Sequence, residues 1–184
     1  MGCNCQNKRA AAPTPLMGLS SEDLLAPSEW GPILWKFLHC LAEHLGQTGS
    51  TIIDTDQAQY TETLLSTIPL ILPCLECQEH AAAYLAANPV PSLVGLYGNA
   101  LRDTVRLWLF LFHNAVRAQQ GIMITTVEEC QALYQDCVVK TCEYTLFVQA
   151  VGAAVKLGRI RLENWRKWFS KAERLRIISG NMVR

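Results

Sequence analysis

Apolar residues recur along this chain at the three- and four-residue spacing of an α-helix, and no segment with the strict alternation of a strand stands out. A first helix is expected to begin near Ser28, with an apolar stripe formed by Ile33, Leu34, Phe37, Leu38, Leu41 and Leu45. Two more helices are expected over residues 54–67 and from residue 73 or 74 to just before Asn88 and Pro89.

The second half of the chain continues the helical pattern. A fourth helix is expected over residues 99–120, with a stripe formed by Leu101, Val105, Trp108, Leu109, Phe112 and Val116. Thr126 and Glu129 have the spacing of a capping box and predict the start of a short fifth helix. The pattern therefore predicts an all-α fold, a four-helix bundle plus a short fifth helix.

Both ends of the chain differ from this core. Residues 1–27 are rich in Gly, Asn, Ala and Pro, show no period and are expected to form a flexible tail. Residues 143–184 are interpreted as a basic, helical C-terminal extension, with an apolar stretch at 145–157. Residues 161–178 have the pattern of a basic amphipathic helix, which either lies on a membrane surface or partner, or folds onto the bundle.

Composition sharpens this picture. Half of the 184 residues are hydrophobic, so a core can form without disulfides, and eight cysteines exceed what stability requires. The net charge is zero, but residues 156–184 contain nine Lys and Arg against two Glu, which by charge suits an acidic partner, a membrane surface or nucleic acid. No nucleic-acid partner is expected for the function inferred below. No secretory signal or bilayer-length apolar run is visible, so we expect a cytoplasmic protein.

The most informative motif is the Cys74-Leu75-Glu76-Cys77 sequence at the expected start of the third helix. Unpaired backbone N–H groups and the helix dipole favour a thiolate at such a position, which suits a redox-active pair. The spacing alone leaves a redox pair and half of a zinc site equally open, because Cys3 and Cys5, or Cys137 and Cys142, would complete a zinc tetrad. A thioredoxin-type fold is disfavoured, since no βαβ pattern surrounds the pair.

Three segments taken in order give a more specific indication: residues 30–39 (WGPILWKFLH), residues 72–89 around the cysteine pair, and residues 108–116 (WLFLFHNAV). Together they resemble the Erv/ALR family of FAD-dependent sulfhydryl oxidases, and the likeness covers residues 28–137. The match looks closest to the compact enzymes of large cytoplasmic DNA viruses. The resemblance implies that residues 28–142 form an FAD-binding sulfhydryl oxidase domain.

The resemblance also implies roles for individual residues. Cys74 would meet the electron donor and Cys77 would lie next to the flavin. The positions that surround FAD in the family correspond here to Trp30, Gly31, Trp35, His39, His113, Asn114, Val116 and Arg117. Gly31, Trp35 and His39 recur every four residues and therefore share one helix face. The chain departs from the family at Phe110, where a cysteine that pins the fifth helix is common, and at Arg117, whose charge could serve the cofactor's phosphates.

The implied reaction oxidises protein dithiols and passes electrons through FAD to O2, giving H2O2. The resemblance also implies a homodimer, located in the cytoplasm and, for a viral protein, in the virion.

The outer cysteines offer several candidates for a shuttle pair. Cys3 and Cys5 are the first candidates, and Cys137 with Cys142, or Cys130 with Cys137, are others. Cys40 is expected to be a buried thiol. Gly2 and Cys3 form an incomplete acylation motif, which would bring the N-terminus to a membrane. The alternative function is a zinc-stabilised, membrane-attached adaptor without enzymatic activity.

Overall fold

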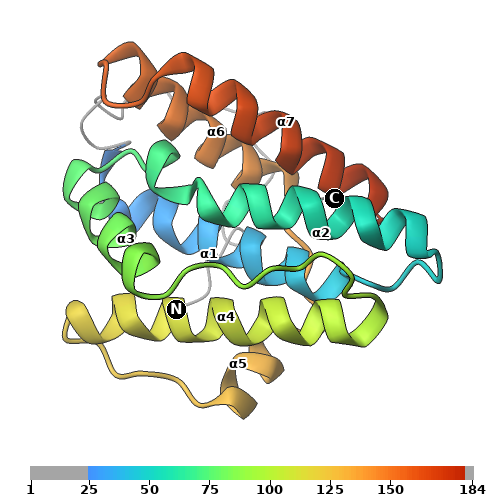
Figure 1. Ribbon diagram of the computed structural model, residues 1–184. Helices are drawn as coiled ribbons and strands as arrows, with labels where there is room; N and C mark the ends of the chain where they lie inside the picture. The colour runs from blue at the N-terminus through green and yellow to red at the C-terminus, as the bar shows by residue number, and fades with distance from the viewer. Residues whose placement is uncertain (1–24, 181–184) are drawn as a thin grey trace, which may run out of the picture.

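A computed structural model describes residues 25–180, and the secondary-structure elements within them are all helices (Figure 1). The helices are α1 (Pro27–His44), α2 (Thr51–Ser66), the 3-10 helix η2 (Ile68–Ile71), α3 (Leu75–Ala87), α4 (Gly98–Gln119), α5 (Val127–Tyr134), α6 (Thr141–Lys156) and α7 (Leu162–Ile178). No strand is assigned in this part of the chain. The prediction of an all-α bundle is confirmed.

Local side-chain chemistry sets several helix ends. Ser50 caps α2 by accepting a hydrogen bond from the backbone N–H of Ile53, so this helix begins three residues before the expected start. The predicted capping box of α5 is present: the Glu129 N–H donates to Thr126 Oγ1 at 3.2 Å, and the Thr126 N–H donates to Glu129 Oε2 at 2.8 Å. The capping box is a local signal, which is why the sequence pattern located α5, whereas the Ser50 cap was not anticipated and the start of α2 was placed too late.

A close backbone approach joins the end of α1 to the start of α4. Gly46 has φ of +65°, and a Cβ at this position would lie 2.1 Å from the carbonyl oxygen of Gly98. The N–H of Gly46 donates to Gln57 Oε1 at 2.8 Å, and the N–H of Gly98 donates to Asp54 Oδ2 at 2.8 Å. Only glycine fits at position 46, because any side chain would push the two segments apart.

Helix α1 is the centre of the molecule and contacts α4, α5 and α6, while α2 contacts α4 and α7 (Figure 1). One continuous core joins these helices; among its largest fully buried side chains are Phe37, Leu41, Leu64, Phe147 and Trp168. The packing places the fifth helix against α1, beside α4.

The C-terminal extension is part of this core. Trp168 of α7 is buried, and its Nε1 donates to the backbone oxygen of Leu64 on α2 at 3.1 Å. On α6, Glu143 is buried and forms an ion pair with Lys36 of α1 at 2.7 Å. Of the two interpretations of the amphipathic helix, the structure shows the one in which it folds onto the bundle. The expected boundary between residues 142 and 143 falls inside α6.

None of the helices in residues 25–180 has both the length and the apolar character needed to cross a membrane.

Candidate active site

Cys74 and Cys77 form a disulfide at the start of α3, with their Cα atoms 5.1 Å apart. Cys74 is the N-cap of this helix, and its Sγ accepts a hydrogen bond from the backbone N–H of Cys77 at 3.2 Å. The helix starts at Leu75, one or two residues later than expected, and the first sulfur lies at the positive end of the helix dipole. Both cysteines are half-buried, so exposure alone does not distinguish their roles.

The residue after the pair anchors it to two other segments. The Gln78 side chain donates from Nε2 to the backbone oxygen of Leu72 at 2.8 Å and to that of Arg159 at 3.1 Å. The first bond fixes the turn before the disulfide. The second joins α3 to the turn between α6 and α7, so the C-terminal extension forms one border of the disulfide's surroundings.

Stacked aromatic rings connect α3 with α1 and α4. Tyr84, two turns after Cys77 on α3, stacks on Phe112 with ring centroids 4.7 Å apart. Phe112 meets Trp35 edge to face at 5.2 Å, and Trp35 stacks on His113 at 4.1 Å with the planes 5° apart. Such a series of flat, apolar faces suits a planar ligand.

The predicted histidines meet in this series. His39 Nε2 and His113 Nδ1 are 3.2 Å apart, so one ring donates and the other accepts, and Tyr134 of α5 stacks on His39 at 4.2 Å. Burial, with a further contribution from His113, lowers the pKa of His39 to about 3. Burial and the positive charge of Arg117 lower the pKa of His113 to about 4. Both imidazoles are therefore neutral at neutral pH.

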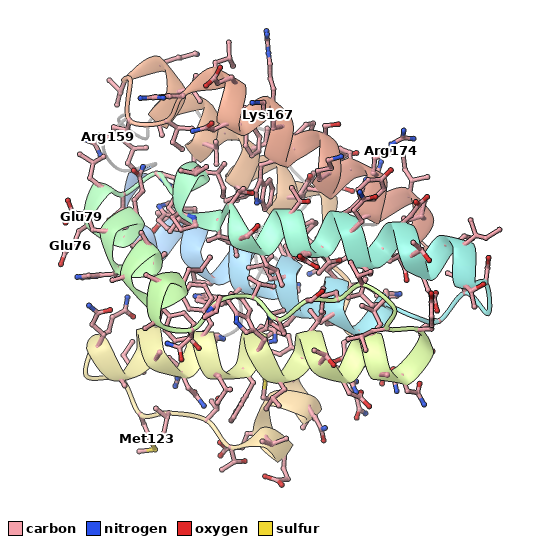
Figure 2. All side chains as sticks on the ribbon, in the orientation of Figure 1. Glu76, Glu79, Met123, Arg159, Lys167 and Arg174 are labelled. Atoms are coloured by element: carbon pink, nitrogen blue, oxygen red, sulfur yellow. A yellow bond between two sulfur atoms is a disulfide. The ribbon has the colours of Figure 1, made fainter. Side chains whose placement is uncertain are left out.

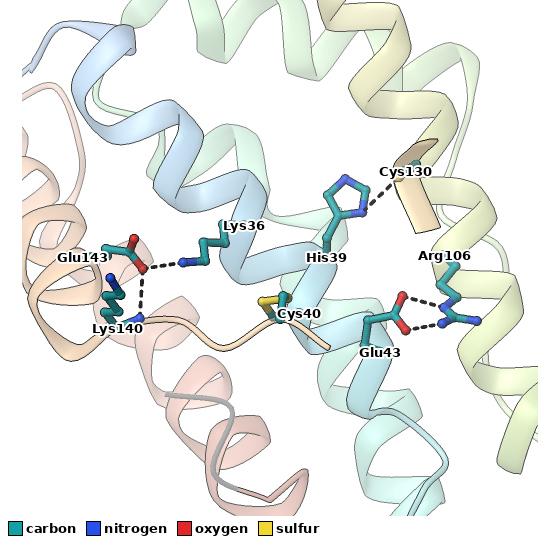
Figure 3. The surroundings of a disulfide bond; sticks show 9 residues. Lys36, His39, Cys40, Glu43, Arg106, Cys130, Lys140 and Glu143 are labelled. Carbon is teal, nitrogen blue, oxygen red and sulfur yellow. Dashed lines mark hydrogen bonds and ion pairs between the residues drawn. A yellow bond between two sulfur atoms is a disulfide. The ribbon is translucent and has the colours of Figure 1, made fainter. Parts of the chain in front are cut away.

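A pocket of about 130 Å³ opens beside the histidine pair, between α1, α4 and α5. Its lining includes His39, Leu107, Phe110, Cys130 and Tyr134. Figure 3 shows an ion pair between Glu43 and Arg106 at its edge, with Cys130 Sγ 4.0 Å from His39 Nδ1.

The thiol of Cys130 is poorly suited to thiol–disulfide exchange. Burial and the charge of Glu43 raise its pKa, so it stays protonated at neutral pH. It therefore contributes a small, uncharged wall to the pocket.

The segment that leads into α5 is held by two of the predicted cofactor residues. Asn114 donates from Nδ2 to the backbone oxygen of Thr125 at 2.9 Å and accepts the Thr125 N–H on Oδ1 at 3.0 Å. Arg117 donates from Nε to the backbone oxygen of Met123 at 2.8 Å. In this structure Asn114 and Arg117 thus position the loop that carries α5 over the histidine pair.

A second disulfide corrects the sequence analysis. Cys40 was expected to be a buried thiol, but it bonds to Cys137, with Cα atoms 5.5 Å apart (Figure 3). Helix α5 ends at Tyr134, and the following turn brings Cys137 to α1, which spacing along one helix does not predict. Cys137 is therefore not available here to pair with Cys130 or Cys142; within residues 25–180 those two cysteines remain thiols.

The remaining predicted residues have separate positions. Trp30 is buried, and its Nε1 donates to the backbone oxygen of Leu25 at 3.1 Å, so it serves the core. Gly31 has open space where a Cβ would lie, and Val116 is half-buried against the core. The acylation motif and the shuttle pair Cys3 and Cys5 lie outside the described residues.

Sequence reasoning missed Tyr84, Phe112 and Tyr134 as members of the site. A signal existed for Tyr84, which lies seven residues after Cys77 and hence on the same face of α3. Phe112 was assigned only to the apolar stripe. Nothing in the spacing indicated that Tyr134 would reach His39.

The zinc alternative gains no ligand set from the part of the chain that the structure describes, where no three His, Cys, Asp or Glu residues cluster around a common point.

Comparison with known proteins adds to this geometry. A model of the Erv1/Alr family matches residues 32–135, the segment that contains the disulfide, the aromatic series and the histidine pair. The chain belongs to the Erv1/Alr family. This confirms the resemblance seen in the sequence.

Relatives of the chain carry a common name. A protein of African swine fever virus named FAD-linked sulfhydryl oxidase is 28% identical over 115 residues, which are 62% of this chain and 87% of the relative. The putative FAD-linked sulfhydryl oxidase 096R of Invertebrate iridescent virus 3 is 31% identical over 93 residues, 50% of this chain and 57% of the relative. The FAD-linked sulfhydryl oxidase ERV1 of Arabidopsis thaliana is 24% identical over 115 residues, covering 61% and 54%. No solved structure matches the chain.

Proposed function

We propose that this chain is an FAD-linked sulfhydryl oxidase that forms disulfides in protein dithiols and delivers the electrons to O2. One observation carries the proposal: a disulfide at a helix N-terminus and a stacked series of rings ending in two neutral histidines occur together in an Erv1/Alr chain. The names of the relatives support FAD as the cofactor.

The residues fit a flavin in their chemistry. Trp35, His113 and Tyr134 offer flat faces to a planar ring system. The His39 and His113 rings are neutral, and since they bond to each other through His39 Nε2 and His113 Nδ1, Nε2 of His113 is left as the polar group for the edge of such a ring. The pocket of about 130 Å³ is smaller than the roughly 300–1,000 Å³ of small-molecule sites. This pocket can therefore hold only part of a dinucleotide.

The thiol chemistry belongs to the cysteine pair. A substrate thiolate attacks Cys74 Sγ, the S–S bond breaks, and Cys77 leaves as a thiolate, so a mixed disulfide joins the substrate to Cys74. The substrate's second thiolate then attacks its own sulfur in the mixed disulfide and releases the Cys74 thiolate. The backbone N–H that reaches Cys74 Sγ and the α3 dipole stabilise that thiolate.

The cofactor completes the cycle. When bound, FAD supplies the acceptor for the electron pair of the two reduced cysteines and passes it to O2, giving H2O2. The protein supplies the surroundings of these groups. The stacked rings of Tyr84 and Phe112 lie between α3 and α4, and the histidine pair adds no positive charge at neutral pH.

The experiment is a flavin and oxygen assay on the full chain. The purified protein should be yellow and consume O2 when given dithiothreitol. Cys77→Ser should keep the flavin but lose oxidation by at least a hundredfold, because no disulfide can form; Cys142→Ser, at an exposed cysteine outside both disulfides, should behave as wild type. A colourless protein with stoichiometric zinc would refute the proposal.

Assembly and location extend the proposal on the basis of the family resemblance alone. A homodimer is expected and is tested by light scattering of the purified chain. Action in the cytoplasm, and in virions if the chain is viral, is tested by locating the protein in cells and particles.

A further inference from the structure

Five cations line the turn between α6 and α7 and the first turns of α7. They are Lys156, Arg159, Arg161, Arg166 and Lys167, here called the basic rim, and all five are exposed. Within residues 25–180 none of them forms an ion pair with a carboxylate. Glu163 is the one acidic side chain among residues 156–167. The rim is therefore a concentration of unpaired positive charge.

The basic rim borders the redox disulfide. The backbone oxygen of Arg159 accepts a hydrogen bond from Gln78, the residue directly after Cys77. Figure 2 shows Arg159 at the same end of the molecule as Glu76 and Glu79 of α3. The turn that carries Arg159 and the exposed carboxylates of Glu76 and Glu79 therefore lie at one end of the molecule, next to the start of α3.

The charges on the two borders are unequal. The α3 side has two exposed carboxylates, Glu76 and Glu79, and the turn that meets Gln78 through Arg159 belongs to a segment with five exposed cations. The positive end of the α3 dipole adds to the same potential. An extended chain advances about 3.3 Å per residue, so the residues that flank a bound cysteine extend beyond the disulfide into its charged surroundings.

We propose that the basic rim selects substrates, and that this chain favours protein dithiols whose cysteines are flanked by Asp or Glu. The inference rests on the proposed oxidase function and specifies its substrate class. Charge complementarity of this kind raises the association rate, and added salt reduces this increase by screening the charges.

The test compares two dithiol peptides that differ only in flanking charge, Asp and Glu in one and Lys and Arg in the other. The wild-type enzyme should show a kcat/KM for the acidic peptide on the order of tenfold higher at low salt. Arg159→Glu should reduce that value several-fold and leave dithiothreitol oxidation unchanged, since its backbone oxygen still holds Gln78. Arg174→Glu is the matched control, because it makes the same charge change on α7, well beyond the basic rim (Figure 2).

Binding gives a readout that needs no turnover. A fluorescent acidic peptide with Ser in place of Cys should bind wild type and the Arg174→Glu variant equally, and the Arg159→Glu variant more weakly, by anisotropy. Equal kcat/KM for the two peptides, with dithiothreitol still oxidised, would overturn the substrate inference alone. Loss of dithiothreitol oxidation in the wild type would instead refute the oxidase proposal.

A lipid surface is the competing use of these cations. Sedimentation with phosphatidylserine–phosphatidylcholine vesicles separates the two. If Arg159→Glu weakens vesicle binding while the wild type shows no preference between peptides, the rim serves a membrane and the substrate inference is wrong.

Discussion

At the scale of residues, the site depends on two imidazole rings that touch without carrying charge. His39 is 3% exposed and its Nε2 faces His113 Nδ1, so protonating either ring would bury a cation beside a second ring and near Arg117. Burial lowers both pKa values well below that of a free histidine, to about 3 for His39 and about 4 for His113. The pair therefore stays uncharged over the whole neutral range.

This arrangement predicts a pH dependence of stability. In the unfolded chain both histidines become protonated below about pH 6.5. In the folded chain His113 becomes protonated only near pH 4 and His39 only near pH 3. Stability should therefore fall as the pH drops from 6.5 to 4, with a slope of up to about 1.4 kcal/mol per pH unit for each proton. Denaturant unfolding of wild type and His39→Gln at several pH values measures it. Identical slopes for the two proteins would contradict the prediction.

At the scale of elements, α5 is a short helix held at both ends. The Asn114 amide fixes the loop before it, and the Cys40–Cys137 bond fixes the turn after it. Its ring contact with the site is Tyr134 on His39. Phe110 stands where the family often has a cysteine that pins the fifth helix. In this chain the Cys40–Cys137 disulfide ties the turn after the fifth helix to α1 instead.

Removing that bond should loosen α5 before the rest of the fold. Cys137→Ser should lower the free energy of unfolding by about 2–4 kcal/mol, because the disulfide closes a loop between residues 97 apart. Amide hydrogen exchange in residues 127–134 should rise. Cys142→Ser, with no bond to lose among the described residues, should match wild type. Unchanged exchange in α5 would show that the loop contacts alone hold it.

At the scale of the whole molecule, the C-terminal extension and the bundle share one core. Trp168 contacts Phe37 and Phe147 and bonds to Leu64, so α1, α2, α6 and α7 meet around a single indole. A second contact joins α2 to the end of α7: Ser179 Oγ accepts a hydrogen bond from Gln57 Nε2 at 2.9 Å.

Unfolding should therefore be a single transition. Trp168→Ala should lower the stability of the entire chain by about 3–5 kcal/mol. Ile177→Ala, at a 68% exposed position on the same helix, should change it by less than about 0.5 kcal/mol. Calorimetry and circular dichroism measure both variants. Two separate transitions in the wild type would mean that α6 and α7 fold independently.

The sequence predicted what local patterns encode. Apolar stripes located α1 and α4 within one or two residues, Thr126 and Glu129 located α5, and the ordered motifs indicated the Erv1/Alr family and its flavin chemistry. The sequence pattern did not predict contacts between segments that are far apart in the chain. The pairing of Cys40 with Cys137 depends on the turn after α5. An amphipathic stripe looks the same whether it faces a membrane or α2, so the position of α7 required the structure.

The hydrogen bond from Gln78 to Arg159 joins two segments that lie far apart in the sequence and whose substitutions have different consequences. The redox residues lie within residues 32–135, which the family model matches, whereas the basic rim lies beyond them. Substitutions in the α6–α7 turn can alter which proteins reach the disulfide without touching a residue of the redox centre. Among Erv1/Alr proteins with such an extension, preference for a client protein can therefore change while the chemistry stays constant.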